Sequence, residues 1–157
     1  MSGSGAGLNR VYSTILSCNT GTAVVSTPLS GYGTIGVNDS GMVLNEALGF
    51  TKWTFTLLGG GTGYSVSVYG TNDPTAHIVW SQKMNPGQYT TPASLPASSW
   101  FLLPGPSEQT GTGTIANPMT GTAPVFQFSG SLLAVRAVLT ASATPAGSIT
   151  VAVLAVP

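Results

Sequence analysis

Ionised side chains are scarce in this chain, and that scarcity limits the surfaces with which it can fold. Only 5% of the 157 residues are Asp, Glu, Lys or Arg, and the formal net charge is +0, against about 25% charged residues in an average soluble domain. Glycine, serine and threonine make up 60 residues. Copies of such a chain do not repel one another by charge. We therefore expect its outer surface to be covered by copies of itself or by a larger assembly.

Apolar and polar residues alternate in several short segments, which is typical of half-buried β-strands. Trp53–Leu58 and Tyr64–Tyr69 alternate in this way, and Gly59–Gly63 between them has the length of a hairpin loop. The turn signal Gly70–Pro74 comes next. His77–Trp80 then predicts a further strand.

The C-terminal part predicts two more strands, Leu132–Thr140 and Ser148–Val156, on either side of a proline-glycine turn at Ser142–Gly147. We expect them to form an antiparallel hairpin. The last strand is apolar on both faces, so it must be covered on both sides, by the domain or by a neighbouring subunit. Val11–Cys18 is also strand-like and holds the only cysteine. We expect Cys18 to be a small buried side chain, without a disulfide or a cysteine-based metal site.

The middle of the chain differs from the rest, because seven of the eleven prolines fall between Met84 and Phe128. Proline cannot donate to a sheet ladder, so this stretch is predicted to be loop or edge strand. It contains the apolar run Trp100–Leu103, which either anchors the loop on its own core or inserts into a partner.

These patterns predict an all-β chain, built as an antiparallel β-sandwich or a jelly-roll-like domain, with a closed barrel as the other option. Helix signals are nearly absent. We expect residues 1–8 to form a flexible arm and residues 9–157 a single β domain. Within it, residues 84–128 form a loop-rich insertion.

The residues that enzymes use are few, and no enzyme activity, cofactor or metal is predicted. His77 is the only histidine; it is expected to be solvated on a strand, although Asp73 is close in sequence. Neither a nucleophile elbow nor a phosphate-binding glycine motif occurs. Asp39 and Asp73 lie in turns, where side-chain hydrogen bonds are expected in preference to a calcium ion.

Four basic residues spread over the chain cannot follow a phosphate backbone, so nucleic acid is not an expected partner. No run of about 20 apolar residues occurs, so no membrane partner is expected. The N-terminus lacks the features of a signal peptide, and we expect synthesis in the cytoplasm. Arg136 lies in an apolar strand; it either faces solvent or meets a carboxylate, one from another subunit included.

Three segments carry a resemblance to a known family. Tyr64–Asp73, a strand followed by Gly-Thr-Asn-Asp, and the pair Leu133–Thr140 and Ala146–Val151 resemble small capsid decoration (cement) proteins of tailed bacteriophages. The resemblance implies an all-β module on the exterior of the virion capsid, made in the host cytoplasm. It implies binding across subunits of the major capsid protein, as a homodimer or homotrimer, and no catalytic residues.

The predicted function is therefore to decorate and stabilise a capsid from outside. The candidate partner contacts are Trp100, Phe101, Leu102, Leu103 and Arg136. The alternative is a tail-tube, tail-spike or fibre component. In that case the tryptophans Trp53, Trp80 and Trp100, together with exposed tyrosines, would form a platform for carbohydrate.

Overall fold

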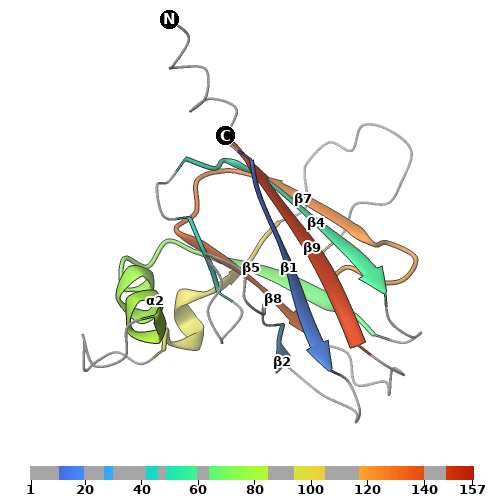
Figure 1. The fold of residues 1–157 in the computed structure, drawn as a ribbon, viewed down its shortest axis with the longest axis horizontal. Coiled ribbons are helices and arrows are strands. Elements are labelled where there is room, and N and C mark those ends of the chain that lie inside the picture. Colours follow the sequence, from blue (N-terminus) through green and yellow to red (C-terminus); the bar gives the residue numbers. More distant parts are fainter. Residues whose placement is uncertain are drawn as a thin grey trace, which may run out of the picture.

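Two antiparallel sheets packed face to face form the fold, a β-sandwich (Figure 1). The computed structural model describes residues 11–19, 27–29, 42–45, 49–59, 64–84, 94–104, 117–139 and 148–157. Nearly all regular structure within these ranges is strand, as the sequence predicts. The predicted arm, residues 1–8, and much of the predicted insertion 84–128 lie outside the described residues.

The first sheet, sheet A, contains four strands in the order β1-β9-β4-β7. Their bounds are Tyr12–Asn19 for β1, Ser148–Val156 for β9, Lys52–Gly59 for β4 and Val125–Ser129 for β7. Every neighbouring pair is antiparallel. The apolar C-terminal strand β9 therefore lies inside the sheet, where β1 and β4 pair with its two sides.

The second sheet, sheet B, has the order β2-β8-β5-β6, with β3 also paired to β8. The strands are β2 (Thr27–Pro28), β8 (Ala134–Leu139), β5 (Val66–Thr71), β6 (Phe101–Leu102) and β3 (Val43–Leu44). The proline-rich segment thus supplies the short edge strand β6, as well as β7 of sheet A. The 3-10 helix η1 (Ala97–Ser99) precedes β6.

Both predicted hairpins are wrong, although the strands themselves are confirmed. β4 belongs to sheet A and β5 to sheet B, and β8 and β9 are divided between the sheets in the same way. In both pairs, the two strands that follow one another in the sequence lie in opposite sheets. Much of the connecting segments Gly59–Gly63 and Ser142–Gly147 lies outside the described residues.

The predicted strand His77–Trp80 is also wrong, because these residues belong to the helix α2, Ala76–Met84. Asp73 organises the turn before the helix: its Oδ1 accepts hydrogen bonds from the backbone N–H of Thr75 at 2.9 Å and from its hydroxyl at 2.7 Å. The N–H of Ala76 donates to the carbonyl of Asp73 at 3.0 Å. Pro74 fits this turn because it lacks the N–H that a helix start leaves unpaired.

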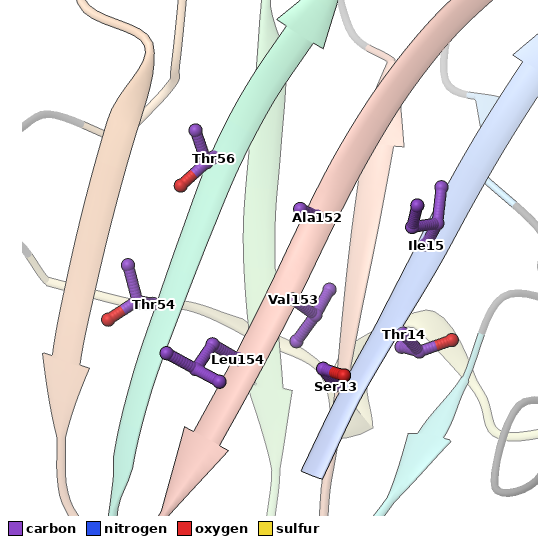
Figure 2. Close-up of a pocket in the computed structure, with 8 residues that line it drawn as sticks. All are labelled: Ser13, Thr14, Ile15, Thr54, Thr56, Ala152, Val153 and Leu154. Atoms are coloured by element: carbon purple, nitrogen blue, oxygen red, sulfur yellow. The ribbon is translucent and has the colours of Figure 1, made fainter. Parts of the chain in front are cut away.

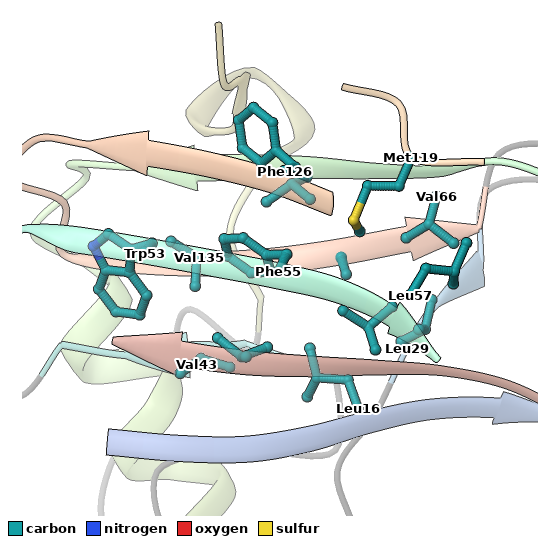
Figure 3. Packing of buried hydrophobic residues seen from close by; sticks show 14 of the residues in the cluster. Leu16, Leu29, Val43, Trp53, Phe55, Leu57, Val66, Met119, Phe126 and Val135 are labelled. Atoms are coloured by element: carbon teal, nitrogen blue, oxygen red, sulfur yellow. The ribbon is translucent and has the colours of Figure 1, made fainter. Parts of the chain in front are cut away.

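The main core fills the space between the two sheets (Figure 3). Trp53, Phe55 and Phe126 are its largest fully buried side chains, and their alternation in β4 and β7 follows the predicted period of two. A second cluster lies between α2 and the outer face of sheet B: Met42, Leu44, Ala76, Val79 and Ala134.

Because of this second cluster, sheet B is covered on both faces near α2. The outward residues Ser67 and Thr71 of β5 are also buried, where the alternating sequence predicts a half-buried strand. In sheet A only the inner face is covered by the described residues. Leu154 of β9 is 42% exposed on the other face, so the predicted cover on both sides of the last strand is absent from the described part of the chain.

Candidate interaction surface

Arg136 lies on the outer face of sheet B, where β8 and β5 place it directly opposite Tyr69. Its guanidinium carbon lies 4.4 Å from the ring centroid of Trp100 and 5.6 Å from that of Tyr69. The sequence does not predict the two aromatic rings against which the cation is half-buried. No salt bridge from Arg136 to a carboxylate occurs among the described residues, and its Nε has no hydrogen-bond partner.

Burial lowers the pKa of the Arg136 guanidinium below its ordinary value, and the nearby Tyr69 opposes this shift. An arginine in a protein keeps its proton at neutral pH. The side chain is therefore a partly desolvated cation, which the negative faces of the two rings stabilise. Such a cation, already ordered and partly dry, is well prepared to accept a carboxylate from another molecule.

A hydrogen-bond network fixes the segment that carries Trp100. The hydroxyl of Ser99 donates to Oδ2 of Asp73 at 2.6 Å, and the hydroxyl of Thr71 donates to the carbonyl of Ser99 at 2.8 Å. These bonds join η1 to the end of β5 and to the start of α2. The hydrogen bonds from Ser99 and Thr75 lower the pKa of the Asp73 carboxyl, which makes Asp73 a structural anion of this turn.

The two residues after Trp100 are exposed. Phe101 and Leu102 form β6, pair with Gly70 and Tyr69 of β5, and are 43% and 49% exposed. Leu103, the next residue, is buried in the main core. The alternatives predicted for this run therefore apply to different residues: Leu103 and Trp100 anchor the segment, while Phe101 and Leu102 are available to a partner.

Asn117 holds the edge beside β6 in place. Its side-chain amide donates to the carbonyls of Val68 and Leu103, each at 2.8 Å, and its Oδ1 accepts the N–H of Val68 at 2.9 Å. The amide pairs with Val68 as the backbone of a further strand would. Sequence analysis missed this residue, because an asparagine in a proline-rich segment carries no signal of such a contact.

A second exposed apolar region lies on the outer face of sheet A (Figure 2). It is a shallow groove with Ala152 of β9 at its centre, between Ile15 of β1 and Thr56 of β4. Leu154, two residues after Ala152 on the same face of β9, also lines the groove. The sequence signal for this region is the outward phase of each strand, which carries small hydroxyl and apolar residues and a single charge, Lys52.

Groups with catalytic chemistry do not converge in the described part of the chain. His77 is half-buried on α2, which corrects its predicted place on a strand. No group of three His, Cys, Asp or Glu side chains that could hold a metal occurs among the described residues. Asp39 and the side chain of Cys18 lie outside the residues and side chains described. No helix of the described ranges is long and apolar enough to cross a membrane.

Comparison of the chain with protein-family models, with curated protein sequences and with solved structures found no match.

Proposed function

We propose that this chain is a structural virion protein, which decorates the outside of a tailed-phage capsid and stabilises it by binding across subunits of the major capsid protein. One observation carries the proposal: Leu102 is exposed on the face of sheet B that carries Arg136, because both residues pair with Tyr69, and Arg136 is a half-buried cation without a carboxylate partner among the described residues. Phe101 is exposed beside Leu102 on the edge strand β6. We call Trp100, Phe101, Leu102 and Arg136 the β6 corner. Leu103 is left out of it because Leu103 belongs to the core.

The β6 corner combines the features of an interaction hot spot. A large apolar side chain that becomes buried on binding contributes about 1.5–3 kcal/mol. Aromatic residues and arginine are the types most enriched in such sites. A partner with an acidic residue next to an apolar one would bury Leu102 and neutralise Arg136 in the same contact.

Repetition over a lattice makes modest contacts sufficient for this role. A protein that binds only the assembled shell stabilises that state by mass action, because each bound copy raises the cost of disassembly. Copies that contact two capsid subunits, or one another, gain avidity from each additional contact. Interface cores are depleted of charge, in agreement with the 5% charged residues of this chain.

A pelleting assay with emptied, expanded heads tests the proposal. We expect the protein to bind at micromolar concentration and to raise the resistance of the heads to heat. Leu102→Ser is expected to weaken binding about 10- to 100-fold, from the apolar area that it removes. Leu58→Ser is the matched control, since Leu58 is another exposed apolar residue outside the β6 corner. No binding of the unaltered protein, or equal losses in both variants, would contradict the proposal.

A different experiment, labelling of the protein on intact virions, tests the tail alternative, because it distinguishes a head location from a tail location. The carbohydrate platform loses one of its three residues, since Trp53 is 1% exposed and belongs to the main core. Trp80 and Trp100 are half-buried and pack against the cluster below α2.

A further inference from the structure

Within the residues that the structure describes, the edge of sheet A formed by β1 has none of the protection that the other three sheet edges have. Natural proteins protect edge strands from pairing with other chains by short length, proline, charge or bulges. β2 and β6 have two residues each; β2 contains Pro28, and Pro104 follows β6. β7 has five residues and lies between Pro124 and Gly130, whose φ is 154°.

β1, in contrast, has eight residues without proline, glycine or charge. Within the described ranges it pairs on one side only, with β9. Its inner face contributes Leu16 to the core, while Ile15 on its outer face is 53% exposed. Ile15 also forms one wall of the groove in Figure 2, so the apolar surface continues from the groove to the strand edge.

We propose that β1 pairs antiparallel with β1 of a second copy of this chain, so that two copies of sheet A join into one eight-stranded sheet across a two-fold axis. This inference extends the assembly role proposed above by naming the edge through which copies associate. Its test uses the purified chain without capsid, so each of the two proposals can fail while the other holds.

A second copy suits this edge because the strand is compatible with itself. The net charge of the chain is +0, and β1 contributes no charge, so two copies meet without repulsion. Antiparallel pairing of two strands of this length forms about seven or eight backbone hydrogen bonds. A two-fold axis closes the contact at two subunits and leaves β1 no further free edge.

The two-fold axis also restricts the register. An axis perpendicular to the sheet keeps the outer face of each strand on the same side, so outward residues must lie opposite outward residues. A pair centred on Ile15 brings the two exposed isoleucines together and places Ser13 opposite Ser17 of the second copy. A pair centred on Leu16 would place Ile15 opposite Ser17. The apolar cross-strand pair favours the register centred on Ile15.

Light scattering and sedimentation of the purified chain test the interface. We expect a dimer at micromolar concentration, and Ile15→Lys to raise its dissociation constant at least about tenfold, because it sets two ammonium groups opposite each other. Gln127→Lys is the matched control, since Gln127 is an exposed outward residue on β7, the opposite edge of sheet A. A monomer, a trimer, or a dimer that Gln127→Lys dissociates instead would overturn the proposal.

Cysteine cross-linking tests the register and does not depend on losing a contact. In a Cys18→Ser background, Ile15→Cys is expected to form a disulfide-linked dimer, because opposed residues have Cβ atoms about 5 Å apart. Ser13→Cys should stay unlinked, because its two copies would lie about 13 Å apart. The double variant Ser13→Cys with Ser17→Cys should link. Cross-linking of Ser13→Cys as fast as that of Ile15→Cys would reject the register.

Discussion

Gly70 lies where β5 passes close to two buried leucines. A Cβ atom added there would come within 2.8 Å of Cδ2 of Leu103 and 2.9 Å of Cδ2 of Leu132. Both leucines are almost fully buried, so they have little room to move away. The glycine is therefore required for close packing.

Gly70→Ala is expected to lower the free energy of unfolding by about 1–3 kcal/mol, the usual cost of an overpacked core. Urea unfolding measures this change. Gly49→Ala is the control, since nothing lies within 4 Å of a Cβ at that exposed position, and we expect it to change stability by less than about 0.5 kcal/mol. Equal effects of the two substitutions would show that the crowding at Gly70 is relieved without cost.

Asp73 makes the stability of the turn before α2 depend on pH. The folded state lowers the pKa of this carboxyl, chiefly through the hydroxyl of Ser99. Its stabilising contribution is therefore fully present above the unfolded pKa of about 3.9 and is lost as the pH falls through the lower folded pKa. We expect the stability difference between the unaltered protein and Asp73→Asn to be constant near neutral pH and to narrow below about pH 4.

Urea unfolding at a series of pH values measures that difference. Ser99→Ala provides the matched comparison, because it keeps the carboxylate but removes its strongest hydrogen bond. The pKa of Asp73 should then move back toward its ordinary value, which NMR titration detects. A difference that stays constant down to about pH 3 would contradict the role given to the ionised carboxyl.

The environment of Arg136 could be predicted only in part. A cation in an apolar strand must have a special environment, and the sequence indicates that much. Its aromatic partners are Tyr69 of β5 and Trp100, the residue after η1. No local sequence pattern indicates that these segments lie next to Arg136. The aromatic rings were visible in the sequence, but their distance from the arginine depends on how the sheet pairs.

At the scale of elements, Asn117 extends the edge of sheet B beyond the two residues of β6. Removing its amide leaves the N–H and C=O of Val68 and the C=O of Leu103 without these three hydrogen bonds. We expect Asn117→Ala to lower the free energy of unfolding by about 1–3 kcal/mol, since the N–H of Val68 and the C=O of Leu103 lose this partner, while the C=O of Val68 keeps the N–H of Leu103.

Hydrogen exchange of the Val68 amide locates that loss, and the exchange should accelerate more than that of amides in sheet A. Thr122→Ala serves as a control, because Thr122 is exposed and its hydroxyl pairs only with Thr120 among the described contacts. A Val68 amide that exchanges as slowly in Asn117→Ala as in the unaltered protein would contradict this role of Asn117.

Strand positions could be predicted because each strand carries its own alternation, as in Trp53, Phe55 and Leu57. Strand pairing could not be predicted in this way. The alternation in β4 shows that one face is apolar, but it is the same whichever strand pairs with β4. Neighbouring strands in sequence often pair, as β5 and β6 do, but between β4 and β5 and between β8 and β9 the chain crosses to the other sheet instead. α2 was missed because four residues do not distinguish a period of two from one of 3.6, although Asp73-Pro74 is a helix-start signal.

At the scale of the whole molecule, the described structure presents two uncovered apolar regions on opposite layers. The groove and edge of β1 belong to sheet A, and the β6 corner belongs to sheet B. A subunit with one such region on each sheet can bind a copy of itself through one and a different protein through the other. The two regions differ in one property that is measurable: the β6 corner contains the charge of Arg136, whereas neither the residues that line the groove nor those of β1 are charged.

Salt should therefore separate the two interfaces. Added salt shortens the screening length from about 10 Å at 0.1 M to about 3 Å at 1 M, which weakens contacts between charges. We expect the dissociation constant of the β1 dimer to change less than about threefold over that range, and ammonium sulfate to tighten the dimer by favouring apolar burial.

Binding to heads is expected to weaken more over the same range, because it includes Arg136, and Arg136→Met should remove that salt dependence. Met keeps most of the apolar stem between the rings of Tyr69 and Trp100, so lost packing contributes little to the comparison. Sedimentation at several salt concentrations, with and without heads, measures both interfaces on the same preparation. A dimer that weakens tenfold or more as salt rises would mean that charged residues outside β1 hold the copies together.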